Sequence, residues 1–296
     1  MKPSRTEFIP VRGLAYHLRL WGDPAAPKLI MVHGWMDVSA SFQFLVDALK
    51  RDWQVIAPDW RGYGLTQRAP ADAYWFADYI ADLDFILRHY SPQAPVHLIG
   101  HSLGGNIASH YAGVRPERIA SLVNLEGFGM RRTSPDEAPG RYRKFMDQLA
   151  KPPTLKPYAS FAALAERMMK GNPRLRREQA VFLARHWGAE VDGQVVLLAD
   201  PAHKVVNATL YRTDEAQTCW AAITAPTLVV AARQSEMLTK WIDEAEYRAR
   251  LKHFRFLTEA TVDDAGHMLH HDQPQALATL IENFIAPIQD RGGAQS

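Results

Sequence analysis

Short apolar runs alternate along this chain with stretches in which apolar residues return every three or four positions. The runs are typical of strands buried on both faces of a parallel sheet: Leu29–Val32, Val55–Ala57, Val96–Ile99, Leu122–Leu125 and Thr227–Ala232, with Phe254–Leu257 as the last. The periodic stretches predict amphipathic helices: Ser41–Leu49, Tyr74–His89, Asn106–Val114 and Pro274–Phe284. This alternation indicates an α/β fold, a mostly parallel sheet flanked by helices.

Two regions depart from the alternation. Near the N-terminus, Phe8–Val11 and Tyr16–Trp21 alternate polar and apolar residues and predict an antiparallel hairpin at a sheet edge. Between Gly129 and Cys219 the pattern is helical or irregular, with helices expected at Arg141–Leu149, Phe161–Met169 and Arg176–Trp187 and a short buried segment at Val195–Leu198. We interpret residues 129–219 as a mainly helical cap inserted after the sixth strand, and residues 1–128 and 220–296 as the core. The cap is expected over the carboxyl ends of the strands, where open α/β sheets bind ligands.

Composition narrows the class of protein. The 296 residues are 47% hydrophobic and 22% charged, with a net charge of +2, which gives no reason to expect a nucleic-acid partner. Cys219 is the only cysteine, so no intramolecular disulfide can form. Residues Met1 to Arg12 lack the apolar core of a signal peptide, and no window approaches the ~18 apolar residues of a membrane span. We therefore expect a soluble, cytoplasmic protein; a homo-oligomer is compatible with the sequence.

The stretch from Gly100 to Gly104 carries the clearest chemical signal. It reads Gly-His-Ser-Leu-Gly, it follows the apolar run Val96–Ile99, and a helical stretch comes after it. This is the strand–turn–helix context of a G-x-S-x-G nucleophile elbow, in which a serine stands at the apex of a tight turn. The alternative is a glycine-rich strand–helix turn without catalytic meaning, as any doubly wound fold can contain.

Further motifs follow in a recognisable order. His33-Gly34-Trp35 comes after the third strand, Asp59 to Gly64 after the fourth, and Ala265-Gly266-His267 near the C-terminus. With these pieces and the elbow, the chain resembles the α/β-hydrolase superfamily over nearly its full length. The resemblance implies an α/β-hydrolase fold but says little about the substrate, because one fold hosts many reactions.

Ser102 is then the expected nucleophile, and it needs a base within hydrogen-bond reach. We choose His267, since it lies just beyond the last strand, on a loop at the catalytic end where the family places its histidine. His270 and His271 are the competing candidates. A metal site built on them and Asp272 is disfavoured, because neighbours in sequence seldom point at one ion. His33 and His101 are interpreted as packing or loop-bracing residues.

The orienting acid departs from the usual pattern of the family. Ser235 stands at the position that most members fill with aspartate after the strand Thr227–Ala232, and Glu236 comes one residue later. Glu126 ends an earlier strand, an acid placement that resembles the haloalkane dehalogenase-like branch. We prefer Glu126 as the acid, with Glu236 as the alternative. Without a catalytic role, Glu126 would cap nearby backbone N–H groups.

The remaining expectations concern charge stabilisation and loop structure. By the resemblance, the backbone N–H groups of Leu103 and Trp35 form the oxyanion hole. Asp59 and Arg61 are interpreted as braces between loops. From residue 131 to residue 185 the chain carries a marked excess of Lys and Arg over Asp and Glu. This excess either attracts an anionic substrate or forms a solvated helical face, and the second reading is simpler.

The predicted activity is hydrolysis of an ester or related acyl bond in a small to medium, partly hydrophobic substrate, through an acyl-serine and with no metal or cofactor. Ser102 argues against haloalkane dehalogenase and epoxide hydrolase chemistry, which need an aspartate nucleophile. A carbon–carbon bond hydrolase or a perhydrolase would use the same three residues. A non-catalytic ligand-binding protein of hydrolase fold is the alternative from another class.

Overall fold

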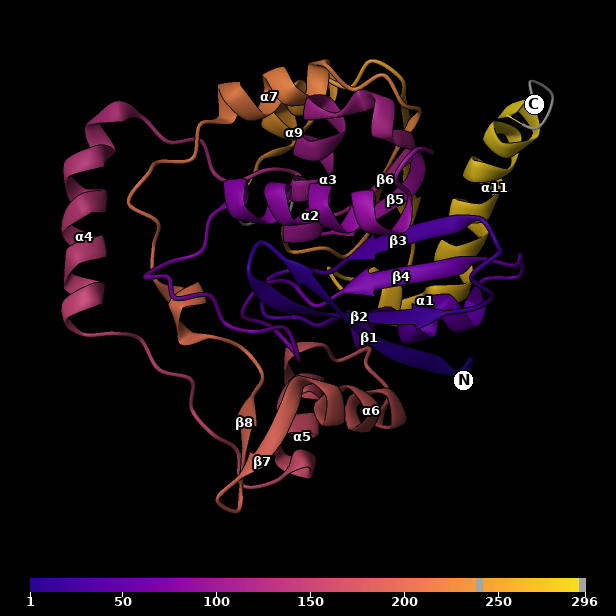
Figure 1. Cartoon of the computed structure of the whole chain (residues 1–296). Helices are drawn as coiled ribbons and strands as arrows, with labels where there is room; N and C mark the ends of the chain where they lie inside the picture. Colours follow the sequence, from indigo (N-terminus) through magenta and orange to yellow (C-terminus); the bar gives the residue numbers. More distant parts are fainter. Residues whose placement is uncertain (238–241, 293–296) are drawn as a thin grey trace.

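The computed structural model, which describes residues 1–237 and 242–292, is built around an eight-stranded sheet, part of which is labelled in Figure 1. Its strands lie in the order β1-β2-β4-β3-β5-β6-β9-β10. Their bounds are β1 Ser4–Val11, β2 Leu14–Trp21, β3 Lys28–Val32, β4 Gln54–Pro58, β5 Val96–His101, β6 Ile119–Leu125, β9 Thr227–Ala232 and β10 Leu257–Val262. β2 runs antiparallel to both β1 and β4, and the other neighbouring strands are parallel. The predicted fold class is confirmed.

Helices cover both faces of this sheet. One face carries α2 (Phe76–Tyr90), α3 (Leu103–Val114), α7 (Thr213–Ala221) and α9 (Glu244–Leu251); the other carries α1 (Gln43–Ala48) and α11 (Pro274–Gly292). A hydrophobic core lies on each face of the sheet, and successive residues of β3 point into the two cores alternately. Ile30 packs in one core and Met31 in the other. The central strands therefore read as continuous apolar runs, because both of their faces are buried.

Most strands, including the N-terminal hairpin, lie where the sequence analysis predicts them, but the prediction for the last strand is wrong. Phe254–Leu257 was expected to form it, whereas β10 begins at Leu257 and ends at Val262. Phe254 is instead a buried residue after α9, in the core beside Trp220. β10 is paired only with β9, contains three polar residues among six and is largely exposed. The more apolar segment before it therefore gave the stronger strand signal.

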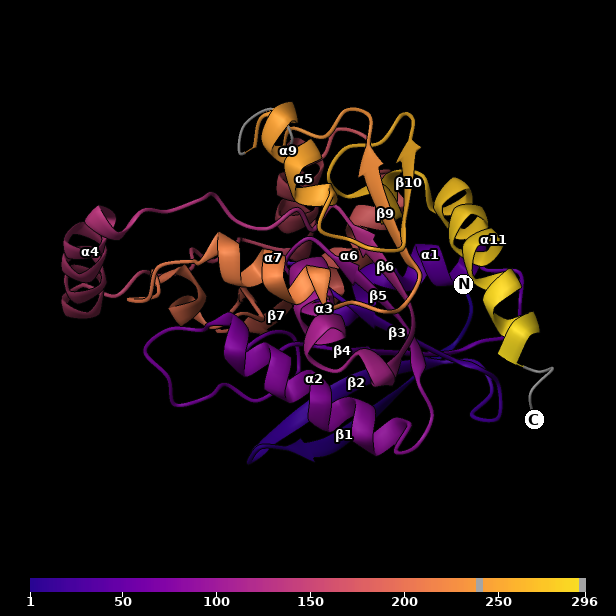
Figure 2. The same ribbon diagram turned by 90° about the horizontal axis from the view of Figure 1, so that it is seen from above.

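Between β6 and β9 the chain forms most of its remaining helices. These are η3 (Pro135–Glu137), α4 (Ala138–Ala150), α5 (Phe161–Gly171), α6 (Arg177–Trp187) and η4 (Pro201–Lys204), with a two-stranded hairpin of β7 (Gly188–Val191) and β8 (Gln194–Leu197). The expected buried segment at Val195–Leu198 is the second strand of this hairpin, in which Val195 is buried. α5 and α6 pack around Phe44 of α1, whereas α4 has no buried residue and stands apart from the other elements (Figures 1 and 2).

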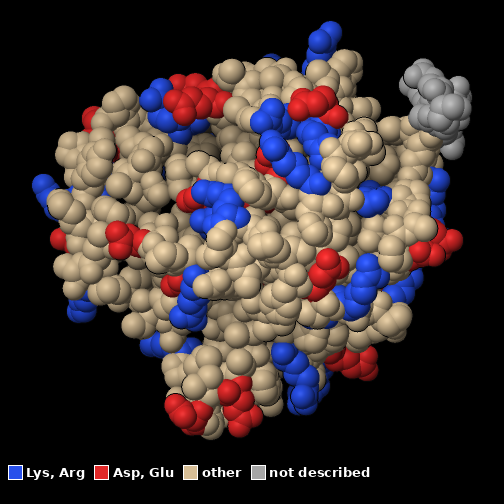
Figure 3. Space-filling model, viewed as in Figure 1, with Lys and Arg blue, Asp and Glu red and all other residues tan. Residues whose placement is uncertain are grey.

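The division into a core and a cap stays a prediction. Its boundary after residue 219 falls inside α7, where Ala216 and Trp220 belong to the core cluster that also contains α3. On the face shown in Figure 3, basic and acidic side chains are interspersed. In the part of the chain that the structure describes, no helix combines the length and apolar character needed to cross a membrane.

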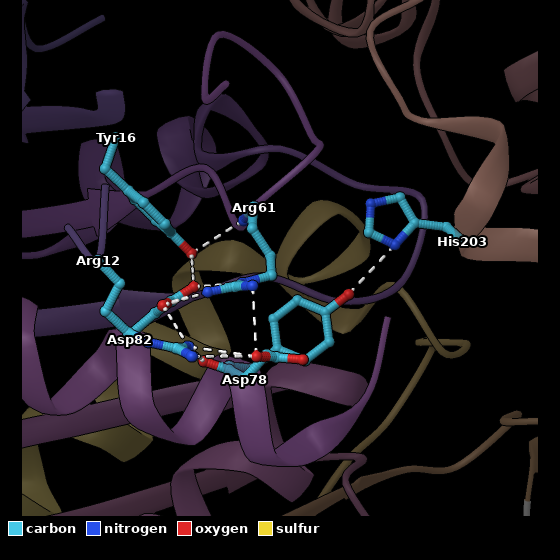
Figure 4. A network of polar contacts seen from close by, with 7 residues as sticks. Arg12, Tyr16, Arg61, Asp78, Asp82 and His203 are labelled. Atoms are coloured by element: carbon cyan, nitrogen blue, oxygen red, sulfur yellow. Dashed lines mark hydrogen bonds and ion pairs between the residues drawn. The ribbon is translucent and has the colours of Figure 1, made fainter. Parts of the chain in front are cut away.

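A buried network of charges ties the loop after β4 to α2 (Figure 4). The carboxylate of Asp82 accepts two hydrogen bonds of 2.6 Å from the Arg61 guanidinium and one of 3.0 Å from the Tyr16 hydroxyl. Arg12 donates to the same carboxylate at 3.1 Å. Burial, and next the charge of Asp82, raises the pKa of Tyr16, so its hydroxyl stays protonated and donates. Asp78 contacts the same arginines but is more than one-third exposed.

Replacing Asp82 with Asn should therefore destabilise the protein strongly. The substitution leaves the Arg61 guanidinium, which is 8% exposed, without its buried counter-ion, and breaking a buried pair typically costs about 3–5 kcal/mol. Asp78→Asn is the matched control, with a loss of about 1 kcal/mol or less because its ion pairs are solvated. Urea unfolding of both variants measures the difference; equal losses would show that the buried carboxylate has no special role.

Candidate active site

Ser102 lies at the apex of a sharp turn between β5, which ends at His101, and α3, which begins at Leu103. Its φ of 53° and ψ of −116° are disfavoured for an L-residue. The backbone N–H of Ser102 donates to the carbonyl of Leu125 on β6 at 2.8 Å, which anchors the apex. The serine is therefore held in a strained conformation by the packing around it.

Two glycines permit this packing. A Cβ atom on Gly100 would lie 2.3 Å from the carbonyl oxygen of Gly104, and one on Gly104 would lie 2.2 Å from the carbonyl oxygen of Val32. Both distances are far below van der Waals contact, so α3 can approach β5 and β3 only because these positions lack side chains. The pattern that first marked the elbow thus has a steric cause in the fold.

The structure brings Ser102 and His267 together. His267 Nε2 lies 2.9 Å from Ser102 Oγ, across 165 positions of the sequence. The histidine lies on the loop after β10, and its side chain is 27% exposed, so the pair is open to a ligand. Ser102 itself is half-buried.

Glu126 lies on the other side of the imidazole. Its Oε2 is 3.2 Å from His267 Nδ1, and its side chain is fully buried. The carboxylate also accepts hydrogen bonds from the backbone N–H of Ala232, at 2.7 Å, and from the hydroxyl of Ser235. A carboxylate can only accept, so Nδ1 carries the hydrogen and Nε2 accepts from the serine hydroxyl. The arrangement can move a proton from Ser102 to His267 beside a buried negative charge.

Position 235 therefore has a definite part in this geometry. The residue that stands where most of the family has aspartate is a hydrogen-bond donor to Glu126, the carboxylate supplied by the neighbouring strand. Glu236, the alternative acid, is exposed. The sequence pointed to both glutamates, but it carried no signal that Ser235 would support one of them, since that contact spans 109 positions.

The predicted oxyanion donors lie on the expected segments. Leu103 is the first residue of α3, where backbone N–H groups have no acceptor within the helix. Trp35 follows Gly34, on which a Cβ atom would come within 3.2 Å of the Ser102 Cβ, so this loop runs alongside the serine. The Trp35 side chain is 54% exposed, and its Nε1–H donates to the carbonyl of His203 at 3.2 Å. The donor role of both residues stays a prediction.

The competing histidines have other partners. His270 and His271 lie on the short helix α10 (Leu269–Asp272), and their Nε2 atoms are 3.3 Å and 2.6 Å from the hydroxyl of Ser41. His33 accepts from the backbone N–H of Trp60 at 2.9 Å, and burial lowers the pKa of its imidazole to about 4. His33 thus joins the loop after β3 to the loop after β4.

Asp59 is a second brace between loops. It accepts hydrogen bonds from His17 Nδ1 at 2.7 Å, from the backbone of Ser39 at 2.7 Å and from that of Leu65 at 2.9 Å. Burial opposes ionisation, but the hydrogen bond and charge of His17 outweigh it and hold the pKa of this carboxyl well below its usual range. The carboxylate stabilises the loops that flank Trp35.

His203 is a residue that sequence reasoning missed. It lies in η4, between β8 and α7, and its ring stacks between Tyr63 and Tyr74 with centroid distances of 3.7 Å and 3.9 Å. Its Nδ1 is 3.1 Å from the Tyr79 hydroxyl. Together with its carbonyl contact to Trp35, this fastens the inserted segment to the loops beside Ser102. Its partners lie at least 124 positions away, so no local motif could reveal it.

The steric account of the elbow can be tested with two helical glycines. Gly104→Ala places a methyl group against the carbonyl of Val32 and should destabilise the protein by about 1–3 kcal/mol or more, as overpacking does. Gly140→Ala, in α4, meets no atom within 4 Å and should be neutral or stabilising by up to about 1 kcal/mol. Chemical denaturation compares them; an unchanged Gly104→Ala would refute the close approach.

Several known proteins are similar to this chain in sequence and in fold. The family model described as alpha/beta hydrolase fold matches residues 27–274. The serine hydrolase-like protein of Danio rerio is 26% identical, over 97% of this chain and 90% of its own length. A 3-hydroxybutyrate-oligomer hydrolase of Cupriavidus necator is 28% identical, over 92% of each chain. Among solved structures, the thioesterase domain from the curacin biosynthetic pathway has a TM-score of 0.85 at 22% identity, covering 94% of this chain and 99% of that one.

Proposed function

The chain belongs to the α/β-hydrolase family and is a hydrolase of that fold, and we propose that it is a serine hydrolase that cleaves an ester or related acyl bond through an acyl-serine. The observation that carries the proposal is the 2.9 Å contact between Ser102 Oγ and His267 Nε2, with the Glu126 carboxylate 3.2 Å from the other imidazole nitrogen. Nucleophile, base and orienting acid are thus within reach of one another.

In the proposed reaction, His267 Nε2 takes the hydroxyl proton as Ser102 Oγ bonds to the carbonyl carbon of the substrate. The negative charge then formed on the carbonyl oxygen is stabilised by the backbone N–H groups of Leu103 and Trp35. The tetrahedral intermediate collapses, and the C–O bond to the leaving group breaks as His267 returns the proton to that group. Water, deprotonated by the same imidazole, attacks the acyl-serine and releases the acid and Ser102.

Glu126 acts through His267 in this scheme. Its carboxylate fixes the tautomer with the hydrogen on Nδ1 and stabilises the imidazolium that forms when the serine proton is taken. The donors from Ala232 and Ser235 compensate for the burial of this charge. Acid placement at the end of β6, with a hydroxyl at position 235, is the finer part of the proposal.

The substrate class is proposed as an ester of small to medium size with a hydrophobic portion. The half-exposed Trp35 and the partly buried Met36 and Leu103 are apolar residues of the two segments that adjoin Ser102. The Cupriavidus relative is named for hydrolysis of 3-hydroxybutyrate oligomers, whose units are joined by ester bonds. Both observations support an ester of this kind.

Ser102→Ala should abolish the reaction and the reactivity of the nucleophile together. We expect a fluorophosphonate probe to label the natural protein but not this variant, and kcat/KM for p-nitrophenyl esters, from acetate to laurate, to fall by roughly 10³-fold or more. Ser134→Ala, which removes an exposed serine just before η3, is the control and should label normally. Absence of labelling in the natural protein would favour a ligand-binding protein instead.

The two candidate acids can be separated by neutralising each. Glu126→Gln should lower kcat/KM by about 10²- to 10⁴-fold, because the imidazolium loses its counter-ion and the wrong tautomer becomes accessible. Glu236→Gln should retain activity within about threefold, as expected for an exposed surface residue. If Glu236→Gln abolished turnover while Glu126→Gln kept it, the assignment of the acid would be wrong and the nucleophile and base would still stand.

A further inference from the structure

Three buried side chains converge directly behind the elbow. Asp37 lies on the loop after β3, His101 is the last residue of β5, and His270 lies on α10. They are 3%, 1% and 0% exposed. One potential ligand atom from each lies within 4.8 Å of the other two. None of these residues takes part in the reaction proposed above.

Each of the three presents a polar atom without a protein partner. Among the residues that the structure describes, Asp37 Oδ2, His101 Nδ1 and His270 Nδ1 are buried and accept or donate no hydrogen bond. Buried polar atoms in folded proteins nearly always have a partner, so a cluster in which each of three residues carries an unpartnered one is exceptional. The cluster therefore has the features of a binding site, in which a bound ion or molecule would be the partner of these atoms.

The protonation states make these atoms lone-pair donors. His101 Nε2 lies 2.8 Å from the carbonyl oxygen of His267, which can only accept, so Nε2 carries the hydrogen. Burial, and next the neighbouring His267, holds the pKa of His101 well below its usual range, and its Nδ1 is consequently unprotonated. The ring is therefore neutral, and its Nδ1 carries a lone pair that no donor among the described residues uses.

The other two ligands follow similar reasoning. Assigning the Ser41 hydrogen to its shorter contact, the 2.6 Å one with His271, leaves the Ser41 oxygen to accept from His270 Nε2 at 3.3 Å. His270 Nδ1 then also carries a lone pair. Asp37 Oδ1 accepts from the backbone N–H of Val38, at 2.8 Å, and its Oδ2 is buried without a hydrogen-bond partner.

We propose that Asp37, His101 and His270 form a binding site for a divalent transition-metal ion of the zinc type. Two neutral imidazole nitrogens and one carboxylate oxygen suit Zn²⁺, Co²⁺ or Fe²⁺, whereas Mg²⁺ and Ca²⁺ prefer oxygen ligands. Tetrahedral metal–ligand bonds of about 2.0–2.2 Å place pairs of ligand atoms roughly 3.3–3.6 Å apart. The three ligand atoms lie within 4.8 Å of one another, so they would have to move closer by up to roughly 1.5 Å when the ion binds.

Two other occupants account for the same geometry. Burial raises the pKa of Asp37 to about 7, so a protonated Asp37 could donate to one of the two imidazoles, which leaves the second without a partner. An ordered water could instead donate to two of the three atoms. The Trp187 indole and Ser41 also face Asp37, and the Trp187 Nε1–H is itself without a partner among the described residues. When Asp37 is ionised, all three atoms carry lone pairs, and a water can donate to only two of them, whereas a metal ion binds all three at once.

The position of the site gives it a structural role. Asp37 lies two residues after Trp35, His101 immediately precedes Ser102, and His270 lies three residues after His267. A bound ion would therefore join the three segments that carry the proposed oxyanion donor, nucleophile and base. It would stabilise their relative positions without contacting substrate, and its presence does not depend on the proposed reaction.

Metal content tests this proposal independently of activity. Because the ligands are enclosed, the protein is unfolded in guanidinium and refolded with Co²⁺ or Zn²⁺, and free metal is then removed by gel filtration. We expect one ion per chain by elemental analysis, and a visible absorption spectrum of Co²⁺ bound in low-symmetry coordination. Loss of a hydrogen bond that supports a metal ligand typically weakens metal binding by about 10- to 100-fold. Asp37→Asn and His270→Gln each remove a ligand itself, so each should weaken binding by more than this.

Matched controls separate this site from other histidines. His271→Gln removes a buried neighbour that also contacts Ser41 but is outside the cluster, and His89→Gln removes an exposed histidine. Both should bind one ion, and circular dichroism checks that every variant is folded. The proposal is overturned if the refolded natural protein retains well under one ion per chain, which would assign the cluster to a proton or water. Equal metal content in folded His270→Gln and in the natural protein would also overturn it.

Discussion

The approach of the first turn of α3 to β3 and β5 is the constraint on which the geometry of the proposed active site depends. Gly100 and Gly104 have no room for a methyl group, and the turn between them forces Ser102 into a disfavoured conformation. The strain persists because both neighbouring strands are buried on two faces and cannot yield. From this one contact follow the exposure of the serine oxygen and the free N–H groups at the helix start. The loops with Trp35 and His267 then need only be placed around it.

Those loops are placed largely by buried charges that have definite partners. Asp59 accepts hydrogen bonds from three segments, and Asp82 binds Arg61 of the loop after β4. Glu126 is a third buried carboxylate, compensated by a backbone N–H, a hydroxyl and an imidazole. In each case the cost of burying the charge is offset locally, so the position of the carboxylate is determined by its donors.

Features that depend on local sequence were predictable, and those that depend on distant partners were not. The elbow, the central strands and the positions of Ser102 and His267 follow from short motifs and apolar runs. The edge strand β10 was misplaced and β7 was missed because both are half-exposed and lack such runs. The support of Glu126 by Ser235, the stacking of His203 and the convergence of Asp37 with two histidines each join positions far apart in the chain. Such contacts exist only once the sheet order is known.

Helix α4 shows how unevenly stability is distributed in this molecule. Thirteen residues form a helix with none of its side chains buried, although Tyr142 and Met146 present apolar surface to solvent. An isolated helix of that length is marginal in water, since nucleation is costly and no packing repays it. The exchange of its amide hydrogens with solvent therefore requires only local unfolding of the helix. The free energy of this opening is far smaller than that of opening the strands behind Ser102. Helix α4, between β6 and α5, can thus unfold and refold while the rest of the protein remains folded.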